Sequence, residues 1–162
     1  PTYGRSTLGQ PLAAASLLNR LQAIAPVPLL NTADFEAGVG FRLAGATTFP
    51  RAMAFGAARD ESLAFQAGRI TAVEDRAVGV YVNFAPVVDV NNNPRNPAIN
   101  IRAFGEDPSL VGRLASAVRA LTGESAVRGH LPIALSTEFP VGHGLERSPQ
   151  SWISPQSCRA RG

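Results

Sequence analysis

The sequence predicts an α/β protein in which strands and helices alternate around a parallel sheet, as in a (β/α) barrel of the TIM type. Apolar runs typical of buried strands alternate along the chain with amphipathic helical segments. Each apolar run ends in a polar cluster, and ligand-binding groups gather at the carboxyl ends of parallel strands. A complete barrel takes about 250 residues. The chain has 162 residues, so we expect a partial barrel.

The first helix is expected over residues 12–24, because Pro11 suits the first helical turn and apolar residues recur at helical spacing. Those apolar positions are Leu17, Leu18, Leu21 and Ile24. Pro26 and Pro28 end this helix. A short buried strand is expected over residues 28–33.

The second helix is expected to begin after Asp60, whose side chain can cap it, and to end near Gly79. Its expected inward stripe consists of Leu63, Ala67, Ile70, Val73 and Ala77. The strand over residues 80–88 follows. It leads into a long polar loop in which Asn91 to Asn96 are expected to shape the backbone, because asparagine tolerates left-handed turns.

The third helix is expected to start at Asp107 and Pro108, the usual order of N-cap and first helical residue. Its expected inward residues are Leu110, Val111, Leu114, Val118 and Leu121. Gly123 closes this helix. The third strand is expected over residues 132–137.

Composition argues against several classes of protein. The formal net charge is +3, and all fifteen cationic side chains are arginines spread singly along the chain. That distribution lacks the basic stripe of a nucleic-acid-binding protein. No apolar run approaches the roughly 20 residues that span a bilayer. With Cys158 as the single cysteine and two histidines, we expect no metal site, no intrachain disulfide and no cofactor. Bacterial cytoplasm, periplasm and secretion all stay open, as does the oligomeric state.

Three segments resemble glycoside hydrolase family 3. "PVPLLNTADFEAGVGFRL" is similar to the family's Asp-x-Glu segment, and "GATTFPRAMAFGAARD" resembles its next loop. "GVYVNFAPVVDVNNNPRNPAINIRAFGEDPSLVG" is similar to the most recognisable family signature. The Asn-Pro-x-Ile-x-x-Arg-x-Phe-Gly portion looks closest to the bacterial β-N-acetylglucosaminidase (β-N-acetylhexosaminidase) branch. The resemblance implies an incomplete N-terminal catalytic domain of TIM-barrel type over residues 1–144. It leaves 145–162 as a tail unlike the family.

The resemblance also implies substrate-binding residues. Asp34 matches the family aspartate that binds hydroxyl groups of the non-reducing sugar; the alternative for it is a cap or loop turn. Arg102 matches an arginine that reaches the sugar, with a structural ion pair to Asp89 or Glu106 as the alternative. Arg42 matches a neighbouring family arginine, which a structural ion pair would explain equally well.

The third strand departs from the family pattern. The family has Lys-His-Phe-Pro-Gly-His-Gly, whereas this chain has "STEFPVGHG". His143 keeps its motif position and is expected to bind substrate or to fix the loop. Thr137 and Glu138 occupy the places of lysine and histidine, and an ionised glutamate can only accept hydrogen bonds.

After Gly144 the sequence contains neither the Asp-Ser-His acid/base motif of this branch nor the later nucleophilic aspartate. We therefore expect no catalytic residues in this chain and no activity from the chain alone. The function implied by the resemblance is retaining exo-hydrolysis of terminal β-N-acetylglucosaminyl residues from glycans or peptidoglycan fragments. One alternative is a β-glucosidase or β-xylosidase of the same family. The other is an inactive fragment or a non-catalytic carbohydrate-binding module.

Overall fold

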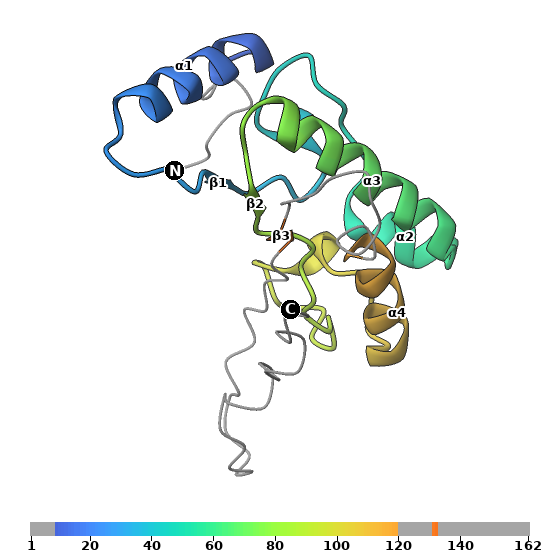
Figure 1. The fold of residues 1–162 in the computed structure, drawn as a ribbon. Coiled ribbons are helices and arrows are strands. Elements are labelled where there is room, and N and C mark those ends of the chain that lie inside the picture. The colour runs from blue at the N-terminus through green and yellow to red at the C-terminus, as the bar shows by residue number, and fades with distance from the viewer. Residues whose placement is uncertain (1–8, 120–130, 133–162) are drawn as a thin grey trace, which may run out of the picture.

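The structure is a computed structural model, and it describes residues 9–119 and 131–132 of the chain. Figure 1 shows α2, α3 and α4 gathered together, while α1 lies apart from them beyond the strands. The elements are, in order, α1 (Pro11–Ile24), β1 (Thr32–Ala33), η1 (Val39–Phe41), α2 (Ala52–Ala58), α3 (Glu61–Ala77), β2 (Val82–Asn83), η2 (Asn100–Arg102), α4 (Pro108–Arg119) and β3 (Leu131–Pro132).

The three strands form one parallel sheet in the order β1-β2-β3. Thr32 lies opposite Val82, and Val82 lies opposite Leu131. Strands that follow one another in the chain are therefore neighbours in the sheet, with helices between them in sequence, as in βα units. The predicted parallel pairing is confirmed. Regular pairing covers only two residues of each strand, and residues 133–137 lie outside the described part of the chain.

The predicted helix starts are confirmed, and each has a local cause. Pro11 is in the first turn of α1. The Asp60 side chain caps α3 by accepting hydrogen bonds from the backbone N–H groups of Ser62 and Leu63, at 2.8 and 3.2 Å. Asp107 accepts in the same way from the Ser109 N–H at 2.9 Å, ahead of α4. These short-range contacts depend on residues within three positions, so a sequence pattern predicts them well.

The predicted inward stripe of α3 is wrong at its large residues, whereas Ala67 is partly buried. The helix buries Ala64, Thr71, Ala72 and Asp75 instead. The predicted positions include Leu63, Ile70 and Val73, whose side chains are exposed. α3 packs against α4 so closely that a Cβ on Gly68 would lie 2.6 Å from the carbonyl oxygen of Val118. The inner face of α3 therefore requires small residues, and hydrophobicity alone selects the opposite face.

Helix α2 lies in a segment that resemblance placed in a loop. It packs against η2, and a Cβ on Gly56 would lie 1.6 Å from the carbonyl oxygen of Phe104. The helix is only seven residues long, and an isolated helix of that length is unstable in water. Its stability therefore depends on tertiary packing, which a local sequence pattern does not report.

The segment before β1 is less buried than predicted. Leu30 is 65% exposed and regular pairing starts only at Thr32. Strand β1 lies at the edge of the described sheet, so one of its flanks lacks a neighbouring strand within the described residues. The prediction assumed a strand covered on both sides, as in the interior of a parallel sheet, and an edge strand is less buried than that.

Two clusters of buried residues form most of the apolar core within the described part of the chain. α4 contributes Leu110, Val111 and Leu114, and Val118 packs against them, as predicted; Leu121 and Gly123 lie outside the described residues. A second cluster joins Phe35 and the η1 region to the segment before β2; its buried members are Phe35, Val39, Leu43, Val78 and Val80. None of the described helices combines the length and apolarity that a membrane crossing requires.

Candidate substrate-binding site

The polar residues that follow β1 and β2 form a charged cluster at the carboxyl ends of these strands. Asp34 and Glu36 directly follow β1. Arg102 comes from η2, in the long segment after β2. Parallel strands place their carboxyl ends at the same edge of a sheet, and this brings residues far apart in sequence into contact. The cluster therefore occupies the place where a barrel of this class binds ligands.

Asp34 is held by Arg42. The Arg42 guanidinium donates from Nη2 to Asp34 Oδ2 at 2.6 Å and from Nε to the Asp34 carbonyl oxygen at 3.2 Å. Both side chains are partly buried, so solvent screens this pair less than a fully exposed one. The two hydrogen bonds fix the carboxylate and its backbone together.

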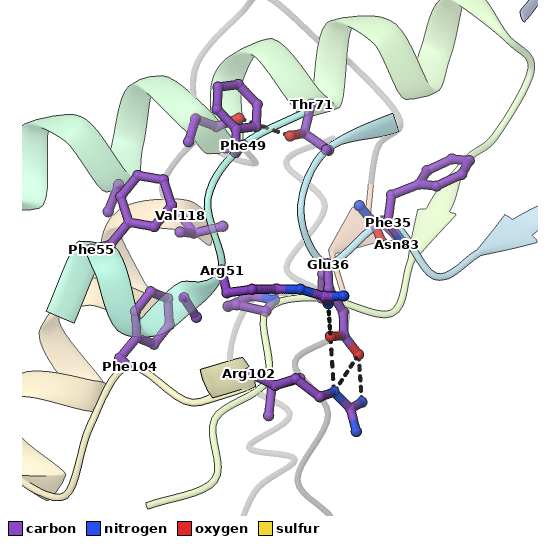
Figure 2. Close-up of a pocket in the computed structure, with 18 of the residues that line it drawn as sticks. Phe35, Glu36, Phe49, Arg51, Phe55, Thr71, Asn83, Arg102, Phe104 and Val118 are labelled. Carbon is purple, nitrogen blue, oxygen red and sulfur yellow. Dashed lines mark hydrogen bonds and ion pairs between the residues drawn. The ribbon is translucent and has the colours of Figure 1, made fainter. Parts of the chain in front are cut away.

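Glu36 binds Arg102 across 66 residues of sequence. Arg102 Nε lies 3.1 and 3.0 Å from the two carboxylate oxygens, and Nη2 donates to Oε1. Arg51 approaches the same carboxylate, with Nη1 3.5 Å from Oε2. Figure 2 shows both guanidinium groups pointing toward Glu36. The sequence alternative that paired Arg102 with Asp89 or Glu106 is thus wrong about the partner: the hydrogen-bonded acid is Glu36.

The ion pair with Glu36 also sets the electrostatics of Arg102. Its hydrogen bond to Glu36 raises the pKa of the guanidinium above the usual value, and burial opposes this effect. The carboxylates of Asp34 and Asp89 raise this pKa further through charge attraction. Arg102 therefore stays charged at every pH at which the protein is folded, as arginines do.

Phe41 contacts two of the arginines. The Arg42 and Arg51 guanidinium carbons lie 4.3 and 4.4 Å from the centroid of its ring. Contacts of this kind orient a guanidinium and stabilise it by about 0.5–1 kcal/mol where it is partly exposed. Phe41 thereby helps to hold the arginines that reach Asp34 and Glu36.

Two side-chain oxygens in the segments after β1 and β2 receive no hydrogen bond from the described part of the chain. Asp34 Oδ1 and Asn91 Oδ1 are buried, and no described residue donates to either. A buried acceptor without a partner costs free energy, and such a group in a cleft is normally satisfied by a ligand or water. Arg102, in contrast, uses three of its five N–H groups in the described contacts. The side chains of Asp34 and Arg102 are 38% and 33% exposed, so the cluster presents a carboxylate and a guanidinium to a polar ligand.

The asparagine-rich loop is shaped by asparagine side chains, but not through the predicted left-handed turns, since none of Asn91 to Asn96 has a positive φ. Asn93 Oδ1 accepts from the Arg95 N–H, and Asn96 Oδ1 accepts from the N–H groups of Ala98 and Ile99. These are local turns of the Asx type. They lead the chain into η2, which carries Arg102.

A largely apolar pocket adjoins the cluster (Figure 2). Glu36, Arg51 and Arg102 form its polar side, and aromatic rings and small residues of α3 line the remainder. Its free volume is about 70 Å³, which is too small for a sugar ring. The pocket borders the charged cluster, with which it shares Glu36, Arg51 and Arg102.

The structure brings together three of the four residues predicted to bind substrate. Asp34 and Arg42 are in direct contact, and the charge of Asp34 acts on Arg102. His143 lies outside the described residues, so its role stays a prediction. Glu36 and Arg51 also belong to the cluster but were not predicted from the sequence. Glu36 had a usable signal, since it stands two residues after Asp34 in the Asp-x-Glu motif. No group of three or more His, Cys, Asp or Glu in the described residues could hold a metal ion.

Comparisons with known proteins identify the family of this chain. The family described as "Glycosyl hydrolase family 3 N terminal domain" matches residues 6–147. Beta-hexosaminidase A of Pseudoalteromonas piscicida is 38% identical over 145 residues, which cover 82% of this chain and 24% of that protein. A Cellulomonas fimi protein named "Beta-N-acetylglucosaminidase/beta-glucosidase" is 36% identical over 142 residues, covering 87% of this chain and 24% of that protein.

Among solved structures, a glycoside hydrolase family 3 beta-N-acetylglucosaminidase from Paenibacillus sp. str. FPU-7 superposes with a TM-score of 0.67 and 44% sequence identity. The superposition covers 72% of this chain and 23% of that one. The chain thus spans about a quarter of the length of these relatives.

Proposed function

This chain belongs to glycosyl hydrolase family 3, and we propose that it supplies the part of such an enzyme that binds a terminal β-N-acetylglucosaminyl residue for hydrolysis with retention. Its fold is the expected one, a partial (β/α) barrel of TIM type. We assign residues 1–144 to the incomplete family domain and residues 145–162 to a tail outside it.

The observation that carries the proposal is the state of Asp34. Its Oδ2 is fixed by Arg42 at 2.6 Å, while its Oδ1 is buried without a donor from the described residues. The Asp34 side chain is 38% exposed, and a sugar hydroxyl is a donor that fits a carboxylate. Arg102, held by Glu36, supplies N–H groups for hydroxyl or carbonyl oxygens of the same sugar. A rigid carboxylate beside a rigid guanidinium is the arrangement that carbohydrate recognition requires.

The names of the relatives favour the hexosaminidase branch, and they also include a dual enzyme named for beta-glucosidase activity. Asp34 and Arg102 would serve a β-glucosidase or β-xylosidase equally well. The N-acetyl group is the feature by which these substrates differ, so the selectivity of binding separates the two assignments.

The proposal is tested by titrating the ¹⁵N-labelled chain with N-acetylglucosamine and, separately, with glucose. We expect N-acetylglucosamine to shift the amide resonances of residues 34–36 and 102, and Asp34→Ala to abolish these shifts. Glu61→Ala is the matched control, because Glu61 is an exposed acid whose partner is Arg113, away from the cluster. Equal shifts with glucose would favour the β-glucosidase assignment. No shifts at residues 34–36 with either sugar would contradict sugar binding at Asp34.

A further inference from the structure

Beneath the charged cluster, Asn83 connects helix α3 to the segment that carries the two acids. Its Nδ2 donates to Asp75 Oδ2 at 3.1 Å, and its Oδ1 accepts from the Phe35 N–H at 3.0 Å. Phe35 stands between Asp34 and Glu36 in sequence. Asp75, Asn83 and Phe35 are all buried, so this chain of hydrogen bonds is shielded from water and correspondingly strong.

The orientation of Phe35 determines where its neighbours point. Phe35 is 2% exposed and packs into an apolar cluster with Val39. Its neighbours Asp34 and Glu36 instead form ion pairs with Arg42 and Arg102. A rotation of the backbone at Phe35 would turn both acids away from Arg42 and Arg102. The Phe35 N–H is the point at which Asn83 prevents that rotation.

Glu74, the residue before Asp75, holds the segment that carries the two acids at its other end, near Thr47. Glu74 accepts from the Thr47 N–H at 3.1 Å and from the Thr47 hydroxyl at 2.6 Å. The Thr47 carbonyl oxygen in turn accepts from the Gly40 N–H at 2.8 Å, within η1. Two consecutive acids of α3 therefore fix both ends of the stretch that carries Glu36 and Arg42.

We propose that Asp75, acting through Asn83, is a positioning residue for the sugar-binding acids Asp34 and Glu36, an assignment that rests on the proposed function. Asp75 does not reach the ligand itself. It fixes the Asn83 side chain so that the amide oxygen faces the Phe35 N–H and cannot flip. The family motif leaves Asp75 unassigned, because it lies in α3 and outside the strand ends.

The charge state of Asp75 gives the network a measurable signal. Burial raises the pKa of this carboxyl to about 7; the hydrogen bond from Asn83 lowers it and the charge of Glu74 raises it. Glu74 is the charged neighbour on α3 itself, and Asn83 is the polar group that faces Asp75 from β2. A change in Asp75 charge should reach the Phe35 amide through Asn83.

The first measurement follows the Phe35 backbone amide and the Asn83 side-chain amide of the ¹⁵N-labelled chain from pH 5 to pH 8.5. We expect both resonances to titrate with one shared midpoint near 7. In Asp75→Asn both should stay near their wild-type positions at low pH and stop titrating. In Asn83→Ala the Phe35 amide should shift and stop titrating. A Phe35 amide that does not titrate in the wild-type chain, or that still titrates in Asp75→Asn, would overturn the inference.

The second measurement separates positioning from general stability. Asn83→Ala should weaken N-acetylglucosamine binding about tenfold, the effect of one lost buried hydrogen bond. Asp75→Asn, which keeps an oxygen that can accept from Asn83, should bind N-acetylglucosamine within about twofold of the wild-type affinity. Val111→Ala, which loosens the α4 core, is the control and should leave the affinity of the folded chain unchanged. Wild-type affinity in Asn83→Ala would overturn the positioning role. If the sugar does not bind at all while the Phe35 and Asn83 amides still titrate together, the proposed function is wrong. The hydrogen-bond chain from Asp75 through Asn83 to Phe35 would then still be confirmed.

Discussion

Arg102 binds Glu36 through both carboxylate oxygens, although the two residues stand 66 positions apart in sequence. The pair joins the segment after β1 to the segment after β2 at the carboxyl edge of the sheet. It also fixes the Arg102 guanidinium within the field of the Asp34 carboxylate, whose charge raises the pKa of Arg102. The sugar-binding geometry that we propose depends on this pair.

Replacing Glu36 with glutamine should therefore destabilise the chain. The Glu36 side chain is 7% exposed and forms ion pairs with Arg102 and, at 3.5 Å, with Arg51. Removing one partner of a largely buried pair leaves a charge uncompensated. Because Arg102 is one-third exposed, we expect a loss of roughly 1–3 kcal/mol rather than the full value for a buried pair. Urea denaturation followed by circular dichroism measures it.

Glu61→Gln is the matched control for that variant. It breaks the pair with Arg113, in which both side chains are about half-exposed, and such a pair contributes about 0–1 kcal/mol. Equal destabilisation by the two variants would show that the Glu36 pair is no more than a surface contact.

The pH dependence of stability should reveal Asp75. Burial raises the pKa of Asp75 from 3.8 to about 7 in the folded chain, so the folded state holds a proton that the unfolded state releases. Stability from this group is complete below about pH 4 and is lost as the pH rises to about 7. At about 1.4 kcal/mol for each pKa unit, the loss is roughly 4 kcal/mol.

Asp75→Asn removes the titrating group while its side-chain oxygen can still accept from Asn83. Urea midpoints of the wild type and this variant should agree near pH 4 and diverge by pH 8, with the variant more stable. Parallel curves across that range would show that Asp75 ionises in the folded chain as it does in the unfolded one.

Two helix glycines should respond to alanine in opposite directions. Gly56→Ala places a Cβ 1.6 Å from the Phe104 carbonyl oxygen, which forces α2 away from η2 and should cost at least about 2 kcal/mol. Gly112 lies in α4, and an added Cβ there would have no described atom of a neighbouring segment within 4 Å. Gly112→Ala should therefore stabilise the chain by about 0.5–1 kcal/mol, since alanine favours the helix. Thermal unfolding of both variants measures the difference, and a neutral Gly56→Ala would refute the tight α2–η2 contact.

The isolated chain should not turn over an aryl β-N-acetylglucosaminide or an aryl β-glucoside. Retaining hydrolysis needs two carboxyl groups about 5 Å apart across the scissile bond. Neither family motif that supplies them occurs after Gly144. Colorimetric assays at high protein concentration test this. Turnover that disappears in Asp34→Ala would mean that the residues assigned to binding also carry the chemistry.

The sequence predicted the features that depend on near neighbours. Patterns within a few residues predict the cap at Asp60 and the N-cap and proline at Asp107 and Pro108. The alternation of apolar runs and helical segments along the chain predicts the parallel strands. The family motif located Asp34, Arg42 and Arg102 at the strand ends. Each of these inferences needs no knowledge of how distant segments pack.

The remaining features depend on distant contacts. The partner of Arg102 was assigned to acids nearby in sequence, and the structure selects Glu36 because β1 and β2 end side by side. The inner face of α3 was misjudged because the contact at Gly68 and Val118 favours small residues over large ones. The role proposed for Asp75 has no local signal at all.

A structure of the chain crystallised with saturating N-acetylglucosamine tests the central claim most directly. We predict one sugar at the carboxyl ends of the strands, with a hydroxyl oxygen about 2.6–3.2 Å from the Asp34 carboxylate and a second oxygen at a similar distance from Arg102. The Glu36–Arg102 and Asp34–Arg42 pairs should remain intact. A sugar seated elsewhere, or Asp34 without sugar at a concentration that saturates the protein in solution, would contradict the account.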